Sequence, residues 1–94
     1  MKKIAVVFNT SDMTPASYHQ VMKDLAASGA EAPKGRLSHI ATNAENGMVV
    51  VDTYDSIESF QQFGETLIPI LVKNGITPPA PEVLFVENEI YPVQ

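Results

Sequence analysis

Short apolar runs alternate with polar turns along this chain, and the runs predict both strands and helices. Four runs rich in β-branched residues have the length and composition of strands; they cover residues 3–9, 36–43, 48–54 and 83–90. Asn46-Gly47 separates the second and third runs and is typical of a two-residue type I′ hairpin turn, whose central positions both need positive φ. The chain therefore contains a predicted hairpin between its second and third strands.

A first helix is predicted to begin at Thr14-Pro15. Threonine is a good N-cap, and proline fits the first helical position, where its missing N–H costs nothing. Apolar residues then recur along one helical stripe at the spacing i, i+3, i+4 and i+7, namely Tyr18, Val21, Met22 and Leu25. Gly29 is expected to end this helix.

A second helix is predicted from Asp55 to Asn74-Gly75. Asp55 is the expected N-cap, and Glu58 stands where a capping box places its acidic member. Pro69 lies inside the apolar pattern, so we expect it to kink the helix or divide it near residue 68. Asn74-Gly75 is a suitable C-terminal cap.

The predicted order is βαββαβ over one domain spanning residues 1–94. The two halves resemble one another faintly, since VVFNTSD and VVVDTYD each precede a helix. This arrangement is the ferredoxin-like α+β sandwich, with both helices on one face of an antiparallel sheet of strand order 4-1-3-2.

Three of the four predicted strands are apolar on both faces. The run from Met48 to Val51 is the clearest case, because alternate side chains of a strand point to opposite faces. Two helices can cover only one face, and a bare apolar face of this size requires a partner. We expect a second copy of the chain to cover it in a homodimer; the alternative is a monomer whose loops cover it.

Composition narrows the possible partners. Six basic residues against 11 acidic residues give a net charge of −5, which argues against nucleic-acid binding. The absence of cysteine excludes disulfides and thiolate chemistry. No run reaches transmembrane length, and the apolar run after the N-terminal lysines is shorter than that of a secretory signal, so we expect a soluble cytoplasmic protein with no membrane partner.

Three polar side chains are predicted to share one face of the hairpin. If Glu45 pairs with Met48 across the turn, His39 lies opposite Tyr54, and Asp52 projects to the same side. An imidazole, a phenol and a carboxylate on an apolar surface can line a pocket, with His39 as the candidate catalytic acid or base and Tyr54 and Asp52 as candidate binding residues. The alternative is that all three are ordinary hydrogen-bonded positions at strand ends.

Two further candidate binding residues are Tyr18 and Glu87. In the predicted strand order Glu87 and His39 lie on opposite edges of the sheet, so Glu87 can approach His39 only across a dimer. His19 lies off the apolar stripe and is expected to face solvent. The two histidines have no metal-ligand spacing and lie in no haem-ligand motif, so neither a metal site nor a cofactor is expected.

Three segments carry a family resemblance: GRLSHIA, NGMVVVDTYDSIESFQQF and LIPILVKNGI. They resemble the dimeric α/β-barrel superfamily of ferredoxin-like proteins, and in particular small bacterial members related to antibiotic-biosynthesis-monooxygenase-type domains. Such members often have tryptophan where this chain has Tyr54, and a His-Asn pair where it has Glu87-Asn88. The resemblance implies a homodimer with its two sheets face to face.

Two functions follow as alternatives. The resemblance is to a superfamily that includes cofactor-free oxygenases, haem-degrading and haem-peroxidase relatives, isomerases and dehalogenating enzymes, and the fold does not select among them. The first function is a cofactor-independent monooxygenase-like enzyme that acts on a small aromatic or apolar substrate, with its pocket near His39 and Tyr54. The second function is a non-catalytic or stress-associated dimer that binds a small apolar ligand. A purely structural interaction module is a third possibility, although no peptide-docking feature supports it.

Overall fold

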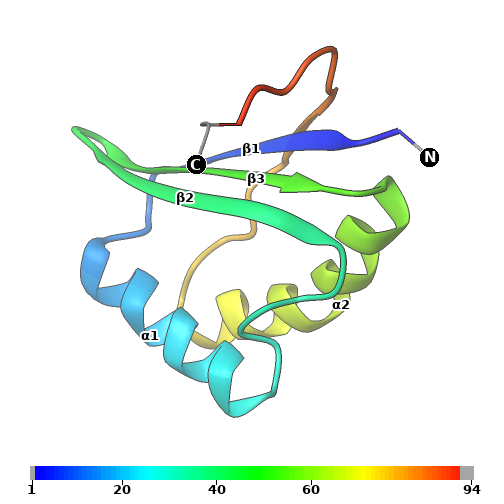
Figure 1. Cartoon of the computed structure of the whole chain (residues 1–94). Helices are drawn as coiled ribbons and strands as arrows, with labels where there is room; N and C mark the ends of the chain where they lie inside the picture. Colours follow the sequence, from blue (N-terminus) through cyan, green and yellow to red (C-terminus); the bar gives the residue numbers. More distant parts are fainter. Residues whose placement is uncertain (1, 92–94) are drawn as a thin grey trace.

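The computed structural model describes residues 2–91, and these form the predicted βαββαβ order (Figure 1). The elements are β1 (Ile4–Thr10), α1 (Pro15–Ala27), β2 (Arg36–Ala44), β3 (Gly47–Tyr54), α2 (Ile57–Lys73) and β4 (Glu82–Phe85). Among the described residues no helix is long and apolar enough to cross a membrane.

The four strands form one antiparallel sheet of order β2-β3-β1-β4, which is the predicted 4-1-3-2 order read in reverse. Both helices lie on the same side of the sheet (Figure 1). The ferredoxin-like α+β fold predicted from the sequence is therefore confirmed.

The core lies between the helices and the inner face of the two central strands. Its most deeply buried side chains are Ile4, Val6, Val21, Leu25, Tyr54 and Ile76. Full burial of a large apolar side chain contributes about 1.5–3 kcal/mol, so this layer holds α1 against the sheet.

The first helix begins and ends where its sequence predicts. The Thr14 hydroxyl accepts a hydrogen bond from the backbone N–H of Ser17 at 3.1 Å, and Pro15 is the first helical residue. Gly29 follows the C-cap with a φ of +75°, a conformation that glycine adopts without a steric penalty.

The second helix begins one residue later than predicted, since Ser56 and not Asp55 is its N-cap. The Ser56 hydroxyl accepts a hydrogen bond from the backbone N–H of Ser59 at 3.2 Å. The Asp55 backbone N–H instead donates to the carbonyl of Gly35, which ties Asp55 to the loop between α1 and β2. Pro69 does not divide the helix. It lies on the exposed side, where water can reach the carbonyl that proline leaves without a donor.

The fourth strand is shorter than the predicted 83–90. Its partner β1 begins at Ile4, which pairs with Phe85. Beyond that pair, the one backbone hydrogen bond among residues 2–91 that joins the two segments runs from the Val86 N–H to the carbonyl of Lys3. Residues 87–90 extend past the end of β1, so no strand in the described part of the chain lies beside them to pair with.

The β2–β3 hairpin turns at Glu45-Asn46, because Ala44 pairs with Gly47. The predicted Asn46-Gly47 turn was wrong. Gly47 has a φ of +123° and lies directly against the backbone at the end of β1, because a Cβ added there would lie 1.9 Å from the carbonyl oxygen of Thr10.

This turn shifts the predicted pairing by two residues. His39 lies opposite Asp52, and the predicted pairing of His39 with Tyr54 was wrong. A shift of two leaves every side chain on its predicted face, because the strand repeat is two residues.

The sheet face away from the helices carries a group of apolar side chains, with the polar Asn9, Ser38, Thr42, Thr53 and Glu82 on the same face. Ile40 on β2 and Leu84 on β4 are 58% and 48% exposed, and Val7, Val49 and Val51 lie between them on the central strands. This set is called the outer apolar face below.

Candidate functional site

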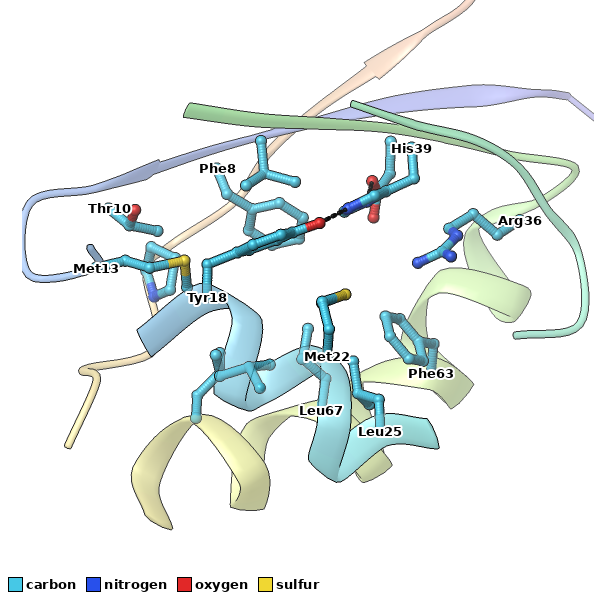
Figure 2. Close-up of a pocket in the computed structure, with 15 residues that line it drawn as sticks. Phe8, Thr10, Met13, Tyr18, Met22, Leu25, Arg36, His39, Phe63 and Leu67 are labelled. Carbon is cyan, nitrogen blue, oxygen red and sulfur yellow. Dashed lines mark hydrogen bonds and ion pairs between the residues drawn. The ribbon is translucent and has the colours of Figure 1, made fainter. Parts of the chain in front are cut away.

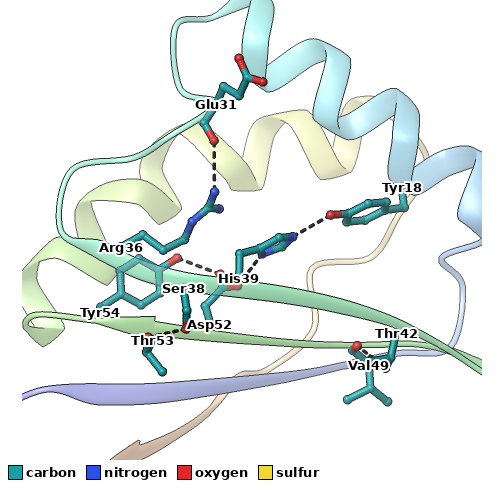
Figure 3. A network of polar contacts seen from close by, with 10 residues as sticks. All are labelled: Tyr18, Glu31, Arg36, Ser38, His39, Thr42, Val49, Asp52, Thr53 and Tyr54. Atoms are coloured by element: carbon teal, nitrogen blue, oxygen red, sulfur yellow. Dashed lines mark hydrogen bonds and ion pairs between the residues drawn. The ribbon is translucent and has the colours of Figure 1, made fainter. Parts of the chain in front are cut away.

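Four polar side chains form a hydrogen-bonded chain between α1 and the inner face of the sheet (Figure 3). The Tyr18 hydroxyl lies 2.6 Å from Nε2 of His39, and Nδ1 of His39 lies 2.5 Å from Oδ1 of Asp52. The Tyr54 hydroxyl donates to Oδ2 of Asp52 at 3.0 Å. His39 is thus held at both ring nitrogens.

The partners of His39 determine its neutral tautomer. An ionised carboxylate can only accept, so Nδ1 carries the hydrogen that is donated to Asp52. Nε2 then carries the lone pair and accepts the Tyr18 hydroxyl hydrogen. A carboxylate that orients an imidazole and leaves Nε2 basic is the arrangement used in general-base catalysis.

Burial keeps the phenols of Tyr18 and Tyr54 protonated. Burial raises the pKa of Tyr18, and burial followed by the charge and hydrogen bond of Asp52 raises the pKa of Tyr54. Asp52 and Tyr54 are 2% and 0% exposed. Their hydrogen bond is therefore shielded from water, which strengthens it.

Three different elements supply the four hydrogen-bonded side chains. The apolar stripe of α1 directs Tyr18 toward the sheet, where its ring lies parallel to the His39 ring with the centroids 6.0 Å apart. Strand alternation in β3 directs Asp52 and Tyr54 inward, and β2 supplies His39. The predicted common face of His39, Asp52 and Tyr54 is confirmed, and Tyr18 joins them.

Glu87 lies elsewhere. It is exposed in the segment after β4, at the edge of the sheet opposite β2, so within the chain it is separated from His39 by the two central strands. His19 is exposed, as predicted. Within residues 2–91 no group of three or more metal-ligating side chains converges.

An apolar cavity of about 50 Å³ opens beside these hydrogen-bonded side chains (Figure 2). Its walls come from α1, α2 and the sheet, and include Phe8, Met13, Met22, Leu25, Phe63 and Leu67. One water needs about 10–15 Å³ of such space, so the cavity as it stands admits only a few waters. A ring-sized ligand requires Met13 or Met22 to move, which their flexible side chains permit.

Arg36 also lines this cavity, and sequence reasoning missed it. Strict alternation from His39 places residue 36 on the outer face. The pairing skips from Ser38–Thr53 to Arg36–Tyr54, so a β-bulge at Leu37 turns Arg36 to the inner face. Nothing in the residue types of this segment indicates a bulge.

The fold is shared with solved structures of small bacterial proteins. NE2512, a protein of unknown function from Nitrosomonas europaea, superposes with a TM-score of 0.67 at 19% identity over 100% of this chain and 98% of its own. A monooxygenase from the gene ActVA-Orf6 of Streptomyces coelicolor, in complex with nanaomycin D, gives 0.62 at 19% identity over 98% and 93%. SnoaB, a cofactor-independent oxygenase from Streptomyces nogalater, gives 0.60 at 16% identity over 97% of each chain.

These likenesses show the fold that the sequence resemblance implied. No family model matches the chain, and no curated protein matches it in sequence. The site must therefore be interpreted from its own residues.

Proposed function

We propose that the protein is a cofactor-independent, monooxygenase-like enzyme whose substrate is a small aromatic compound with an acidic hydroxyl group. The observation that carries this proposal is the Tyr18–His39–Asp52 chain, which ends in an apolar cavity with a basic imidazole nitrogen at its wall. Enzyme sites combine such apolar walls with a few convergent polar groups.

In the proposed reaction the substrate hydroxyl takes the place of the Tyr18 hydroxyl at Nε2 of His39. His39 removes the proton, and Asp52 stabilises the imidazolium that results. The electron-rich anion then reacts directly with O₂. In a substrate whose ring system also carries a CH₂ group, as an anthrone does, that CH₂ group and one O₂ become one carbonyl group and one water, so no external reductant is needed.

The neighbours in fold support this choice of chemistry. One of them is a cofactor-independent oxygenase and another holds nanaomycin D. A fold alone does not assign a reaction, so the proposal depends on His39 and its partners.

Oxygen consumption with a panel of hydroxylated anthrones, which carry both an acidic hydroxyl group and a CH₂ group, tests this function. We expect turnover by the natural chain and a loss of about 10²-fold or more in His39→Gln, since general-base catalysis contributes about 10²–10⁴-fold. His19→Gln is the matched control, because it removes the exposed histidine and should leave the rate unchanged. Equal rates in the two variants would contradict the proposal.

A non-catalytic ligand-binding protein is the second candidate. It is favoured by the short Tyr18–His39 hydrogen bond, which occupies the basic nitrogen when no ligand is present. This alternative predicts that a ring compound is recovered unchanged at one per chain, and that His39→Gln binds it as tightly as the natural chain does.

We also propose that the outer apolar face joins two copies of the chain. The exposed side chains of Ile40 and Leu84 and the half-buried Val51 support this, since these apolar groups otherwise meet water. Sedimentation should give twice the chain mass of 10.2 kDa, and Val51→Glu should halve it. Val72→Glu, which changes an exposed valine on α2, should not; a natural chain that sediments as a monomer would overturn the proposal.

A further inference from the structure

Arg36 brings a positive charge to the wall of an otherwise apolar cavity. The titratable groups that face this space are Tyr18 from α1, Arg36 and His39 from β2, and Asp52 from β3. The lining side chains of α2 are all apolar. Of these groups, only Arg36 is a permanent cation at neutral pH.

Within residues 2–91 no carboxylate lies within ion-pair distance of Arg36. Its Nη2 donates to the backbone carbonyl of Glu31 at 3.1 Å, and its guanidinium lies over the Phe63 ring at 5.8 Å. These contacts orient the group, and Figure 2 shows it pointing toward the space below His39. They use one of the five N–H donors of the guanidinium and leave its charge unneutralised by any described side chain.

The nearby carboxylate of Asp52 does not neutralise the charge of Arg36. Asp52 is 2% exposed, and its two oxygens already accept from His39 and Tyr54. It therefore stabilises the histidine side of the site, while the positive charge of Arg36 faces the cavity.

We infer that the cavity binds its ligand as an anion, with the ionised oxygen of an aromatic hydroxyl group held by Arg36. This inference rests on the proposed function, because it names the form in which that substrate binds. When the ligand O–H bond breaks, the proton goes to Nε2 of His39 and the electron pair stays on the oxygen. Positive charge on the imidazole then faces Asp52, and negative charge on the ligand faces Arg36, so both new charges have a partner.

Two matched ring compounds test the inference by binding alone. 4-Nitrophenol can ionise, and its anion is yellow; 4-nitroanisole has the same ring but no acidic hydrogen. We expect the natural chain to bind the phenol more tightly than the ether and to lower the pKa of the bound phenol below its value in water.

Arg36→Met keeps an aliphatic stem against Phe63 but removes the charge. It should weaken phenol binding by about ten- to a hundredfold, the range for a hydrogen bond to a charged group, and leave ether binding unchanged. Lys23→Gln removes an exposed positive charge of α1 that does not line the cavity and should change neither. If Arg36→Met fails to fold, the pKa of 4-nitrophenol bound to the natural chain, measured by its absorbance, still tests whether the ligand binds as an anion.

Equal weakening of both compounds in Arg36→Met, an unshifted pKa of the bound phenol, or no binding of either compound at millimolar concentration would overturn the inference. A shifted pKa together with absent oxygen consumption would keep the inference and remove the oxygenase. Oxygen consumption that is unaffected by Arg36→Met would support the oxygenase and overturn the inference.

Discussion

Two tyrosines of this chain make the same hydrogen bond in opposite surroundings, and their comparison measures what burial contributes to the site. Tyr54 donates to Asp52 at 3.0 Å, and Tyr91 donates to Glu89 at 2.9 Å; in each pair the acceptor lies two residues before the tyrosine. Tyr54 is 0% exposed, whereas Tyr91 is 64% exposed.

Tyr54→Phe removes only the hydroxyl and leaves one oxygen of the buried Asp52 without that donor. Hydrogen bonds to charged groups contribute about 1.5–3 kcal/mol, so we expect the free energy of unfolding to fall by that amount. For a chain of this length the melting temperature should fall by about 6–24 °C, because each kcal/mol corresponds to about 4–8 °C. Tyr91→Phe should change it little, since water replaces the lost donor.

Urea unfolding monitored by circular dichroism measures both variants against the natural chain. The difference in unfolding free energy between Tyr54→Phe and Tyr91→Phe is the quantity of interest. If the two variants agree within about 0.5 kcal/mol, the usual spread of surface substitutions, the buried carboxylate does not depend on its phenol partner and the reasoning fails.

Three further predictions concern the tautomer, the hairpin and the helix ends. In Asp52→Asn the amide should donate to Nδ1 of His39, move the hydrogen to Nε2 and abolish base catalysis; ¹⁵N NMR of the imidazole reports the tautomer, and an unchanged spectrum with full activity contradicts it. Gly47→Ala should lower the unfolding free energy by about 2 kcal/mol or more, since its Cβ meets the β1 backbone; wild-type stability in urea would refute this. The Asn74 hydrogen bond is the main cause that lowers the pKa of Asp24, so Asn74→Ala should raise that pKa toward its ordinary value, as followed by carboxyl ¹³C NMR. The stabilisation from Asp24 is present above its ordinary pKa of about 4 and is lost as the pH falls through its folded pKa. The variant should lose part of this acid-range dependence, since Gln20 and Lys73 also lower the pKa of Asp24; an unmoved titration would show that the amide has no such effect.

Much of the fold could be predicted because several local signals agree. The cap at Thr14-Pro15 and the stripe that begins at Tyr18 both predict α1, and the strand patterns predict the sheet order. The common face of His39 and Asp52 was predicted correctly even though the turn was misplaced, because an error of two residues preserves the face of every side chain.

The remaining features depend on contacts that local sequence does not encode. Gly47 is a glycine because β1 approaches it, which only the folded sheet reveals. β4 ends where its partner strand ends, although its own sequence stays compatible with a strand. Arg36 reaches the cavity through a bulge at Leu37, and a single inserted residue leaves no signature in the hydrophobic pattern.

Methionine methyl NMR tests the central claim, which is that an acidic aromatic ligand binds between α1 and the sheet beside His39. Met13 and Met22 line the cavity, while Met48 is buried near the hairpin end and does not line it. Titration of methyl-¹³C-methionine protein with 4-nitrophenol should shift the Met13 and Met22 signals by the ring current and leave Met48 nearly unmoved. Saturable binding that leaves Met13 and Met22 in place would contradict the account.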